Sequence, residues 1–320
     1  MTRPEILIPA PMMPGVVAAL RERFVVHQLW DQFDQDAFLA TMAPRIRGLA
    51  ASSLAGRIGD DWFDRLPALE IVANFGVGYD SIDAKTAAER GIVVTNTPGV
   101  LDEEVADLTV GLLLATLRRI PQADRHVRTG AWAQNPFPLS PTLRGRRIGI
   151  LGLGAIGKAV ARRLDAFGVV IAYHGRSKQS DIGYAYHATP VALAAACDVL
   201  IAIVPGGQGT RHLVDAAVLA ALGPDGIFIN VARGSVVDQD ALITALQDGT
   251  ILGAGLDVYA DEPNVPDSLR DLPNTVLLPH IGSGSQHTRE AMGTLVADNL
   301  RAWFDSGKAL TPVAETLNPA

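Results

Sequence analysis

The chain has 320 residues, of which 48% are hydrophobic and 19% are charged, and this ordinary globular composition excludes disordered, collagen-like and coiled-coil proteins. Its length exceeds what one hydrophobic core usually supports and suits two domains. The formal net charge of -7 and the lack of any run of Lys or Arg argue against nucleic acid as a partner.

The N-terminal segment and the helical stretches predict a cytoplasmic protein. Residues 1–15 are interrupted by prolines and lack the sustained apolar core of a secretory signal. The most apolar helix-like stretch, Leu108–Leu117, is far shorter than the ~20 residues that a membrane span requires. We therefore expect no membrane partner.

Four short apolar runs in the first hundred residues predict strands of a parallel sheet. The runs are 5–10, 48–52, 70–75 and 91–96. Helical patterns lie between them, and strands that alternate with helices imply βαβ units. A long helix is predicted over Glu103–Ile120, because acids open it and Arg118 and Arg119 close it, as the helix dipole favours.

A second series of strands begins near Arg146 and predicts a doubly wound sheet. Its six runs are 146–154, 168–175, 197–204, 226–232, 251–259 and 274–282. The single cysteine, Cys197, excludes an intramolecular disulfide, and we expect its thiol to be buried. Helices are predicted over Ala155–Phe167, Asp215–Leu222, Gln239–Gln247 and Gln286–Asp305. We expect the last helix to return to the first series of strands.

A glycine motif after the first strand of this second series predicts a dinucleotide site. Gly152, Gly154 and Gly157 form G-x-G-x-x-G, with Ala155 and Ile156 between the last two glycines. The first glycine permits a tight turn, the second lets the backbone approach a pyrophosphate, and the third lets helix pack on strand. The N–H groups at the start of the helix would bind the anion. The alternative is a glycine-rich turn without a ligand.

The residues that follow the next strand favour NADPH over NADH. Enzymes that prefer NAD place an acid here, but Gly175 stands at about that position and no acid occurs before Asp181. Arg176, Ser177 and Lys178 supply cations and a hydroxyl that suit a 2′-phosphate. We therefore expect NADPH to be preferred, with NADH as the second cofactor, and the alternative is a solvated turn.

Three charged or titratable residues follow later strands of the series. They are Arg233, Glu262 and His280, and residues just past the carboxyl ends of strands in open α/β sheets surround the ligand crevice. Each also has a structural interpretation: a capping group, a loop acid before Pro263 and a structural histidine. No cluster of His and carboxylates has metal-ligand spacing, so no metal is predicted.

A series of motifs from residue 70 to residue 312 gives the chain a resemblance to the D-isomer-specific 2-hydroxyacid dehydrogenases. The motifs are N-F-G-V-G-Y-D at 74–80, V-T-N-T-P at 94–98, D-L-T-V-G-L-L-L at 107–114, G-L-G-A-I-G at 152–157, N-V-A-R-G at 230–234, G-L-D-V-Y at 255–259, D-E-P at 261–263 and L-P-H-I-G-S at 278–283. Within the family, G-A-W at 130–132 and G-R-S-K at 175–178 resemble the glyoxylate/hydroxypyruvate and hydroxyphenylpyruvate reductases.

The resemblance implies an α/β protein with two Rossmann-like parallel-sheet domains. A dinucleotide-binding domain, 99–286, would be inserted into a discontinuous, flavodoxin-like substrate-binding domain formed by 1–98 and 287–320. The linking points would lie near Thr97–Val100 and Gly284–Gln286, and the two domains would close over the substrate.

The resemblance also assigns Arg233, Glu262 and His280 as the catalytic set. Reduction of a 2-keto acid needs a hydride, which NADPH carries, and a proton, which a histidine can supply near neutral pH. Glu262 would orient the ring, and the planar fork of Arg233 would hold the substrate carboxylate and polarise the carbonyl. Backbone N–H groups around Val77 and Gly78 would also bind that carboxylate.

Further cofactor contacts follow from the same resemblance. Adenosine contacts are expected from Val204, Pro205 and Thr210, and contacts near the nicotinamide from Val231, Ala232, Asp257, His280 and Gly282. The segment V-P-G-G-Q-G at 204–209 departs from the more usual P-L-T-x-x-T of the family, which weakens the expected adenosine contacts.

The expected substrate is a small 2-keto acid, glyoxylate or hydroxypyruvate, which would be reduced to the D-2-hydroxy acid. One alternative is phenylpyruvate or 4-hydroxyphenylpyruvate, with the same mechanism. Another is a non-catalytic, dinucleotide-sensing protein that resembles the corepressors of the family. A homodimer is expected through Glu103–Ile120 and the Trp132 loop, where Trp132 either enters the partner's site or packs the interface.

Overall fold

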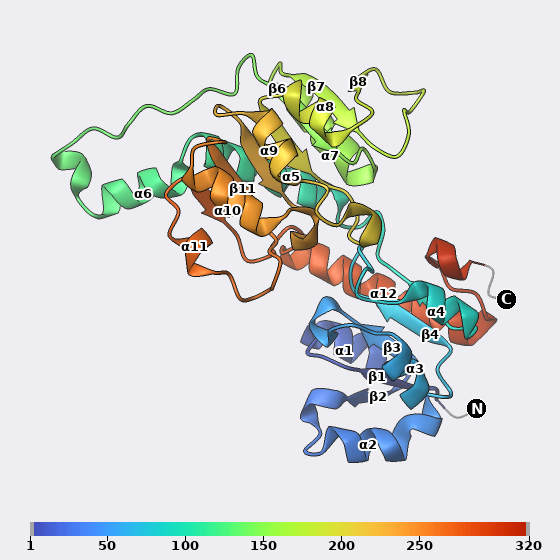
Figure 1. Ribbon diagram of the computed structural model, residues 1–320. Helices are drawn as coiled ribbons and strands as arrows, with labels where there is room; N and C mark the ends of the chain where they lie inside the picture. Colours follow the sequence, from blue (N-terminus) through green and yellow to red (C-terminus); the bar gives the residue numbers. More distant parts are fainter. Residues whose placement is uncertain (1–2, 318–320) are drawn as a thin grey trace. The chain divides into compact units, whose positions relative to one another are not determined.

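A computed structural model describes residues 3–317 of the chain, which divides into two compact units (Figure 1). The first unit extends to Leu101 and resumes at Ser285, and the second comprises Asp102–Gly284. Both units are built on parallel sheets, and the second is inserted into the first, which confirms the predicted fold class. No helix within residues 3–317 combines the length and the apolar character needed to cross a bilayer.

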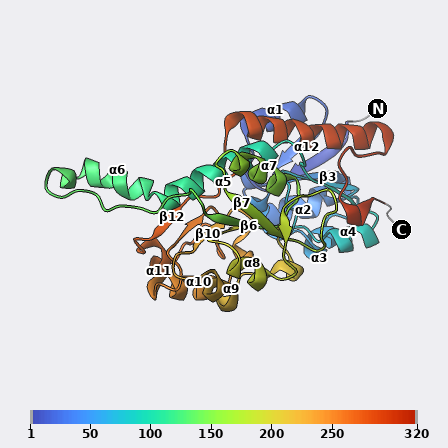
Figure 2. The ribbon, with the colours of Figure 1, turned by 90° about the horizontal axis from the view of Figure 1, so that it is seen from above.

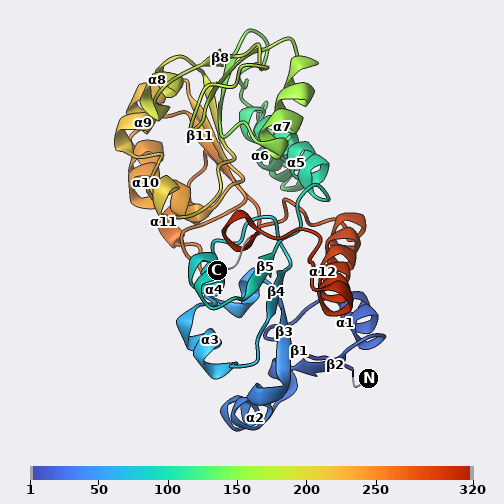
Figure 3. The same cartoon turned by 90° about the vertical axis from the view of Figure 1, so that its right-hand side faces the viewer.

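The first unit is a parallel sheet with helices on both faces (Figure 3). Its strand order, β2-β1-β3-β4-β5, is that of flavodoxin-like sheets. Ile6 and Ile8 of β1 pack in the buried cluster that includes α1 and α12, whereas Leu7 packs in the cluster on the other face. The elements are β1 (Glu5–Ile8), α1 (Pro14–Arg21), β2 (Val25–Gln28), α2 (Gln35–Met42), β3 (Ile46–Ala51), α3 (Asp60–Arg65), β4 (Ile71–Asn74), α4 (Ala84–Glu89), β5 (Val93–Thr95) and α12 (Gln286–Ser306).

Helix α12 brings the end of the chain back to the first unit, as predicted. Figure 2 shows it beside α1. Gly293 of α12 allows the two helices to approach closely, because a Cβ on this residue would lie 2.2 Å from Cγ2 of Val16 in α1. Beyond the helix, Val313 donates its N–H to the carbonyl of Val94 at 2.9 Å, which ties the segment to β5.

The second unit is a larger parallel sheet with the order β12-β11-β10-β9-β6-β7-β8. Counted from β6, this is the order 3-2-1-4-5-6 of dinucleotide-binding sheets, with one more strand at the edge. Buried clusters that include α5 and α7 on one side and α8, α9 and α10 on the other form its core. The strands are β6 (Arg147–Leu151), β7 (Val170–His174), β8 (Ala185–Tyr186), β9 (Val199–Ala202), β10 (Ile227–Asn230), β11 (Gly253–Leu256) and β12 (Thr275–Leu277). The helices are α5 (Asp102–Leu117), α6 (Ile120–Arg128), α7 (Ala155–Asp165), α8 (Pro190–Ala195), α9 (Ala216–Leu222), α10 (Gln239–Gln247) and α11 (Asp267–Arg270).

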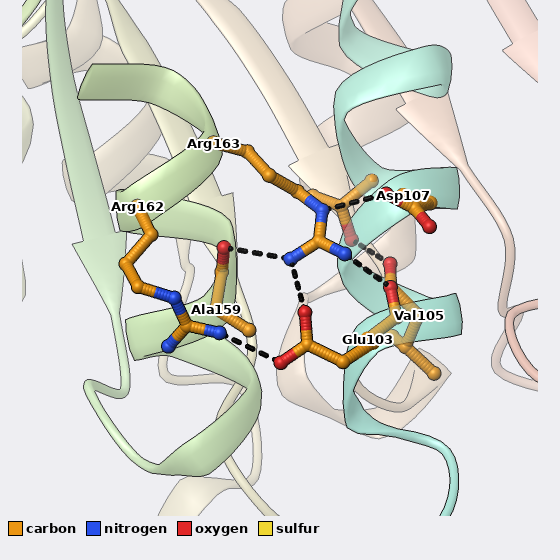
Figure 4. Close-up of polar contacts among 7 residues, drawn as sticks. Glu103, Val105, Asp107, Ala159, Arg162 and Arg163 are labelled. Carbon is orange, nitrogen blue, oxygen red and sulfur yellow. Dashed lines mark hydrogen bonds and ion pairs between the residues drawn. The ribbon is translucent and has the colours of Figure 1, made fainter. Parts of the chain in front are cut away.

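Helices α5 and α7 are joined by a network of ion pairs (Figure 4). Arg163 of α7 donates to Oδ1 of Asp107 at 2.6 Å and to Oε2 of Glu103 at 2.7 Å. The same guanidinium also donates to the backbone carbonyls of Glu103 and Ala159, each at 3.1 Å. Arg162 donates to Oε1 of Glu103 at 2.6 Å. The network therefore fixes the first turn of α5 to the helix that follows the glycine motif.

Three elements differ from the sequence prediction. The helix expected over Glu103–Ile120 ends at Leu117, because Arg119 adopts a left-handed φ of 53° and α6 then begins. Strand β2 was not predicted, because it is an only partly buried edge strand without an apolar run. Strand β8, also at a sheet edge, has only two residues. Helix α6 extends away from the sheet of its own unit (Figures 1 and 2).

Candidate active site

Three neighbouring strands of the second unit, β10, β11 and β12, end beside one another. Arg233 follows β10, Glu262 follows β11 and His280 follows β12. Parallel strands present their carboxyl ends at one edge of the sheet, where α/β proteins bind their ligands. The structure therefore gathers these three predicted residues at one edge.

His280 and Glu262 are in direct contact. Nδ1 of His280 lies 2.6 Å from Oε2 of Glu262, and both side chains are about one-third exposed. Glu262 also accepts the backbone N–H of Tyr259, at 3.0 Å from Oε1. A carboxylate can only accept hydrogen bonds, so Nδ1 of His280 carries the proton in this pair. The ring is thereby oriented, and Nε2 remains for a ligand.

The charges around Glu262 keep it ionised. Burial raises the pKa of Glu262, but the hydrogen bond and charge of His280 outweigh burial, helped by the Tyr259 N–H and the charge of Arg233. The pKa of Glu262 consequently lies below its ordinary value. The carboxylate form is therefore the one that faces His280 at neutral pH.

Asp257, at the end of β11, holds the backbone that follows His280. Its two carboxylate oxygens accept the N–H groups of Ile281 at 2.7 Å and Gly282 at 2.8 Å. Asp257 is 1% exposed, and burial raises its pKa although both N–H groups and the charge of His280 oppose this. The pair of bonds supports the uncommon left-handed backbone of His280, whose φ is 53°.

The backbone around Arg233 is positioned by the buried side-chain amide of Asn230 and by the close packing of Gly234. The side chain of Asn230 accepts the N–H of Ala232 and donates to the carbonyl of Arg233, both at 3.0 Å. Gly234 lies against the backbone of Tyr259, where a Cβ on the glycine would come within 1.8 Å of the Tyr259 carbonyl oxygen. The loop with Arg233 therefore packs directly on the loop that leads to Glu262.

Asn230 and Tyr259 hold the segments that carry the candidate residues, and this role was not predicted from the sequence. Besides holding Glu262 through its N–H, Tyr259 donates its hydroxyl to the carbonyl of Leu278 at 2.8 Å, two residues before His280. Burial and the charges of Asp257 and Glu262 raise the pKa of Tyr259 to about 12, so this hydroxyl stays protonated. Their place in the N-V-A-R-G and G-L-D-V-Y motifs was the only signal for them.

The glycine motif has the geometry of a phosphate-binding turn. Gly152 has φ 97°, and a Cβ there would lie 2.8 Å from the Ile203 carbonyl oxygen. A Cβ on Gly157 would lie 2.2 Å from the carbonyl oxygen of Gly152, so α7 and the strand end touch at this point. At Gly154, which precedes Ala155 and Ile156 at the start of α7, a Cβ would meet no protein atom within 4 Å. The space above Gly154 fits the approach of a pyrophosphate.

The turn after β7 presents the predicted 2′-phosphate residues. Arg176, Ser177 and Lys178 are exposed and make no hydrogen bond or ion pair with the residues that the structure describes. Oδ2 of Asp181, the first acid after this turn, lies 3.9 Å from Nζ of Lys158 in α7. A Cβ on Gly175 would have room, because the nearest atom that it would meet, the Ser177 carbonyl oxygen, lies 4.0 Å away.

The remaining predicted cofactor residues line the ends of β9 and β10. Val204 and Pro205 follow β9, and Thr210 donates its hydroxyl to the Pro205 carbonyl at 2.6 Å, which closes the loop that departs from the family pattern. Val231 and Ala232 directly follow β10. All of these residues belong to the second unit.

Val77 and Gly78 lie in the first unit, just past β4. Asn74 donates to the carbonyl of Gly78 at 3.0 Å, and Asn96 donates to that of Val77 at 2.8 Å. No hydrogen bond among residues 3–317 uses the N–H of Val77 or of Gly78. Two oriented backbone donors are therefore available for an anion such as a carboxylate.

Comparisons with known proteins agree with this geometry. A family model for the D-isomer specific 2-hydroxyacid dehydrogenase, NAD binding domain, matches residues 110–282. The chain is 45% identical to a hydroxyphenylpyruvate reductase of Plectranthus scutellarioides and also 45% identical to glyoxylate/hydroxypyruvate reductase A of Arabidopsis thaliana, in both cases over 96% of this chain and 98% of the relative. A solved structure of NADPH-dependent glyoxylate/hydroxypyruvate reductase from Sinorhizobium meliloti, in complex with NADP and malonate, is 55% identical, covers 98% of each chain and has a TM-score of 0.94.

Proposed function

This chain belongs to the D-isomer-specific 2-hydroxyacid dehydrogenase family, and we propose that it reduces glyoxylate or hydroxypyruvate to the D-2-hydroxy acid with NADPH. The contact between His280 and Glu262 is the observation that carries the proposal, because it leaves Nε2 of the ring to act as the proton donor. Bound NADPH supplies the hydride to the carbonyl carbon.

The chain's own residues bind the substrate and deliver the proton. In the proposal, Arg233 and the N–H groups of Val77 and Gly78 bind the carboxylate of the keto acid. Protonated His280 gives its Nε2 proton to the carbonyl oxygen while Glu262 holds Nδ1 and stabilises the positive ring. One hydride and one proton are consumed for each hydroxy acid formed.

We assign dinucleotide binding to the second unit, and the first unit contributes the N–H groups of Val77 and Gly78 to binding of the substrate carboxylate. The glycine turn supports the pyrophosphate assignment, since a Cβ on Gly154 would meet no protein atom within 4 Å and α7 begins beside it. Arg176, Ser177 and Lys178 are available for a 2′-phosphate, and no carboxylate occurs from 175 to 180 to repel that group.

A second substrate class has specific support. The 45% identity to a hydroxyphenylpyruvate reductase spans nearly the whole chain, so aromatic 2-keto acids are the alternative substrates, with the same residues and the same proton donor.

We also propose a homodimer. Helix α6 and the segment that follows it expose apolar side chains, with Val127 56%, Trp132 65% and Leu139 100% exposed. Exposed apolar patches of this kind mark protein interfaces. Trp132 lies in a short helical turn, Ala131–Ala133, within this segment.

The test is NADPH oxidation by the purified protein with glyoxylate, hydroxypyruvate, phenylpyruvate and 4-hydroxyphenylpyruvate, each repeated with NADH. We expect the highest kcat/KM with the two small acids and NADPH. Higher kcat/KM values with the two aromatic acids would instead assign the protein to the reductases of aromatic 2-keto acids. NADPH binding without turnover of any acid would refute the enzymatic proposal and favour a dinucleotide sensor.

The proton donor is tested in the same assay. We expect His280→Ala to lower kcat by about 10²–10⁴-fold, because the general acid is lost, while NADPH affinity measured by calorimetry is unchanged. His287→Ala, which changes an exposed histidine of α12, is the control and should keep full turnover. Full turnover of His280→Ala would exclude His280 as the acid.

A further inference from the structure

The turn that presents Arg176, Ser177 and Lys178 is held at both of its ends. At the start, the hydroxyl of Tyr186 donates to the carbonyl of Gly175 at 3.3 Å. At the end, the backbone N–H of Gln179 donates to the hydroxyl oxygen of Tyr173 at 2.8 Å. The backbone on either side of the three exposed residues is therefore anchored to the sheet.

Tyr173 and Tyr186, whose hydroxyls bond the two ends of this turn, are paired neighbours in the sheet. Tyr173 of β7 is 0% exposed, and Tyr186 is its neighbour in the parallel pair of β7 and β8. Their ring centroids are 5.4 Å apart, and the ring of Tyr186 also stacks on His174. Tyr173 is fully buried and Tyr186 is partly buried against it, so these packed rings have little freedom and hold their hydroxyls in place.

Gln179 joins this turn to the glycine motif. Its side chain donates from Nε2 to the carbonyl of Leu153 at 2.9 Å, and Leu153 lies between Gly152 and Gly154. The pyrophosphate turn and the cation turn are thus connected by one side chain. This link fixes the glycine turn relative to the cations Arg176 and Lys178, which lie three residues and one residue before Gln179.

We propose that Gln179, supported by Tyr173, is a positioning residue that sets the preference for the 2′-phosphate of NADPH. This inference rests on the proposed binding of NADPH at the turn. Arg176 and Lys178 have many rotamers, and ordering them on a ligand costs conformational entropy. A backbone that already holds both cations beside the pyrophosphate turn lowers that cost for a dinucleotide with a 2′-phosphate. NADH lacks the phosphate and gains nothing from the arrangement.

The test compares the KM values for NADPH and NADH in the Gln179→Ala variant. We expect the KM for NADPH to rise about 3–10-fold, the size of effect that the loss of one hydrogen bond gives. The KM for NADH and the kcat with either cofactor should stay within about two-fold, because the packing at Gly152 and Gly157 still holds the glycine turn and only the cations are displaced. Gln247→Ala, which truncates an exposed glutamine at the end of α10, is the matched control and should change neither KM.

A second variant removes the hydrogen bond between the Gln179 N–H and the Tyr173 hydroxyl without changing the shape of the core. Tyr173→Phe keeps the ring but takes away the acceptor of the Gln179 N–H, and we expect the same selective rise in the KM for NADPH. An equal rise in KM for both cofactors, or no rise in either variant, would overturn the inference.

The double variant Arg176→Ala, Lys178→Ala separates this inference from the proposed function. If it leaves the ratio of the two KM values unchanged, the turn does not bind the 2′-phosphate and the proposed cofactor site is wrong. If it abolishes the preference for NADPH while Gln179→Ala and Tyr173→Phe do not alter it, only the role of Gln179 is refuted.

Discussion

At the scale of single residues, the candidate site depends on hydrogen bonds that orient charged groups. Glu262 holds Nδ1 of His280, and Asp257 binds the two N–H groups that follow this histidine. His280 adopts a left-handed backbone that costs free energy for a residue with a side chain. The two hydrogen bonds that Asp257 accepts offset this cost. Asp257 therefore positions the ring of His280 through the backbone that follows it.

Glu262 should make the stability of the fold depend on pH. Its folded-state pKa lies below the ordinary value, so its ionised form stabilises the fold above the ordinary pKa, and this contribution is lost as the pH falls through the folded-state pKa. We expect Glu262→Gln to lower Tm most near neutral pH and progressively less on acidification below about pH 4. Thermal unfolding of both proteins across that range checks the sign, and a difference in Tm that is independent of pH would contradict it.

At the scale of elements, the glycine motif joins strand β6 to helix α7. Gly157 is needed for packing, because its missing side chain is what lets the helix touch the carbonyl of Gly152. Gly154 has no packing role within the protein, because its Cβ would point into open space. The same motif therefore contains two glycines that the fold requires, Gly152 and Gly157, and one, Gly154, that leaves room for a ligand.

Alanine substitutions should separate these two roles. We expect Gly154→Ala to change the free energy of unfolding by less than about 0.5 kcal/mol but to raise the Kd for NADPH, because the new methyl group takes the space of the pyrophosphate. Gly157→Ala should destabilise the fold by about 1–3 kcal/mol through overpacking. Urea unfolding and calorimetric titration measure both, and equal stability losses in the two variants would argue against the division.

The ion pairs between α5 and α7 provide a second prediction at this scale. The side chain of Arg163 is only 23% exposed and bonds two carboxylates and two backbone carbonyls. The side chain of Arg162 is 60% exposed and, among residues 3–317, donates only to Glu103. We expect Arg163→Ala to lower the free energy of unfolding by about 1–3 kcal/mol. Arg162→Ala, the matched control, should lower it by less than about 1 kcal/mol. Urea unfolding of the two variants compares them, and losses of similar size would show that the buried contacts contribute nothing extra.

At the scale of the whole molecule, the insertion of the second unit into the first explains why helix α12 packs in the same unit as β1 and α1. Helix α12 packs on α1, and the segment after it is tied to β5. Each unit has its own buried clusters on both faces of its sheet. The exposed apolar side chains of α6 and the following segment belong to neither core, which is why we assign them to a dimer interface.

Acidic substitutions in this segment should produce monomers. We expect the double variant Val127→Asp, Leu139→Asp to elute as a monomer in size-exclusion chromatography with light scattering, because two charges would lose their hydration in an apolar interface. Phe33→Asp alters a fully exposed apolar side chain of the other unit and should leave the mass unchanged. A monomeric mass for the unaltered protein would exclude the dimer.

The sequence by itself determined the fold class, the glycine turn and most strands and helices. These follow from local patterns: apolar runs of strand length, helix-terminal charges and a glycine spacing that only a strand–turn–helix satisfies. The edge strands β2 and β8 could not be predicted from the sequence, because they lack a buried apolar run. The break after Leu117 could not be predicted either, because the charges of Arg118 and Arg119 suit the end of a helix at Ile120, whereas Arg119 adopts a left-handed backbone.

Only the tertiary structure decided which side chains hold the site together. Asn230, Tyr259 and Gln179 act through hydrogen bonds to backbone groups, and Tyr259 and Gln179 each reach a carbonyl many residues away in the chain. Such bonds depend on where the packed strands place their ends, and a carbonyl acceptor is identical in every residue. A local pattern of residue types therefore does not reveal these hydrogen bonds, whereas the charged residues that they position were visible in the sequence from the start.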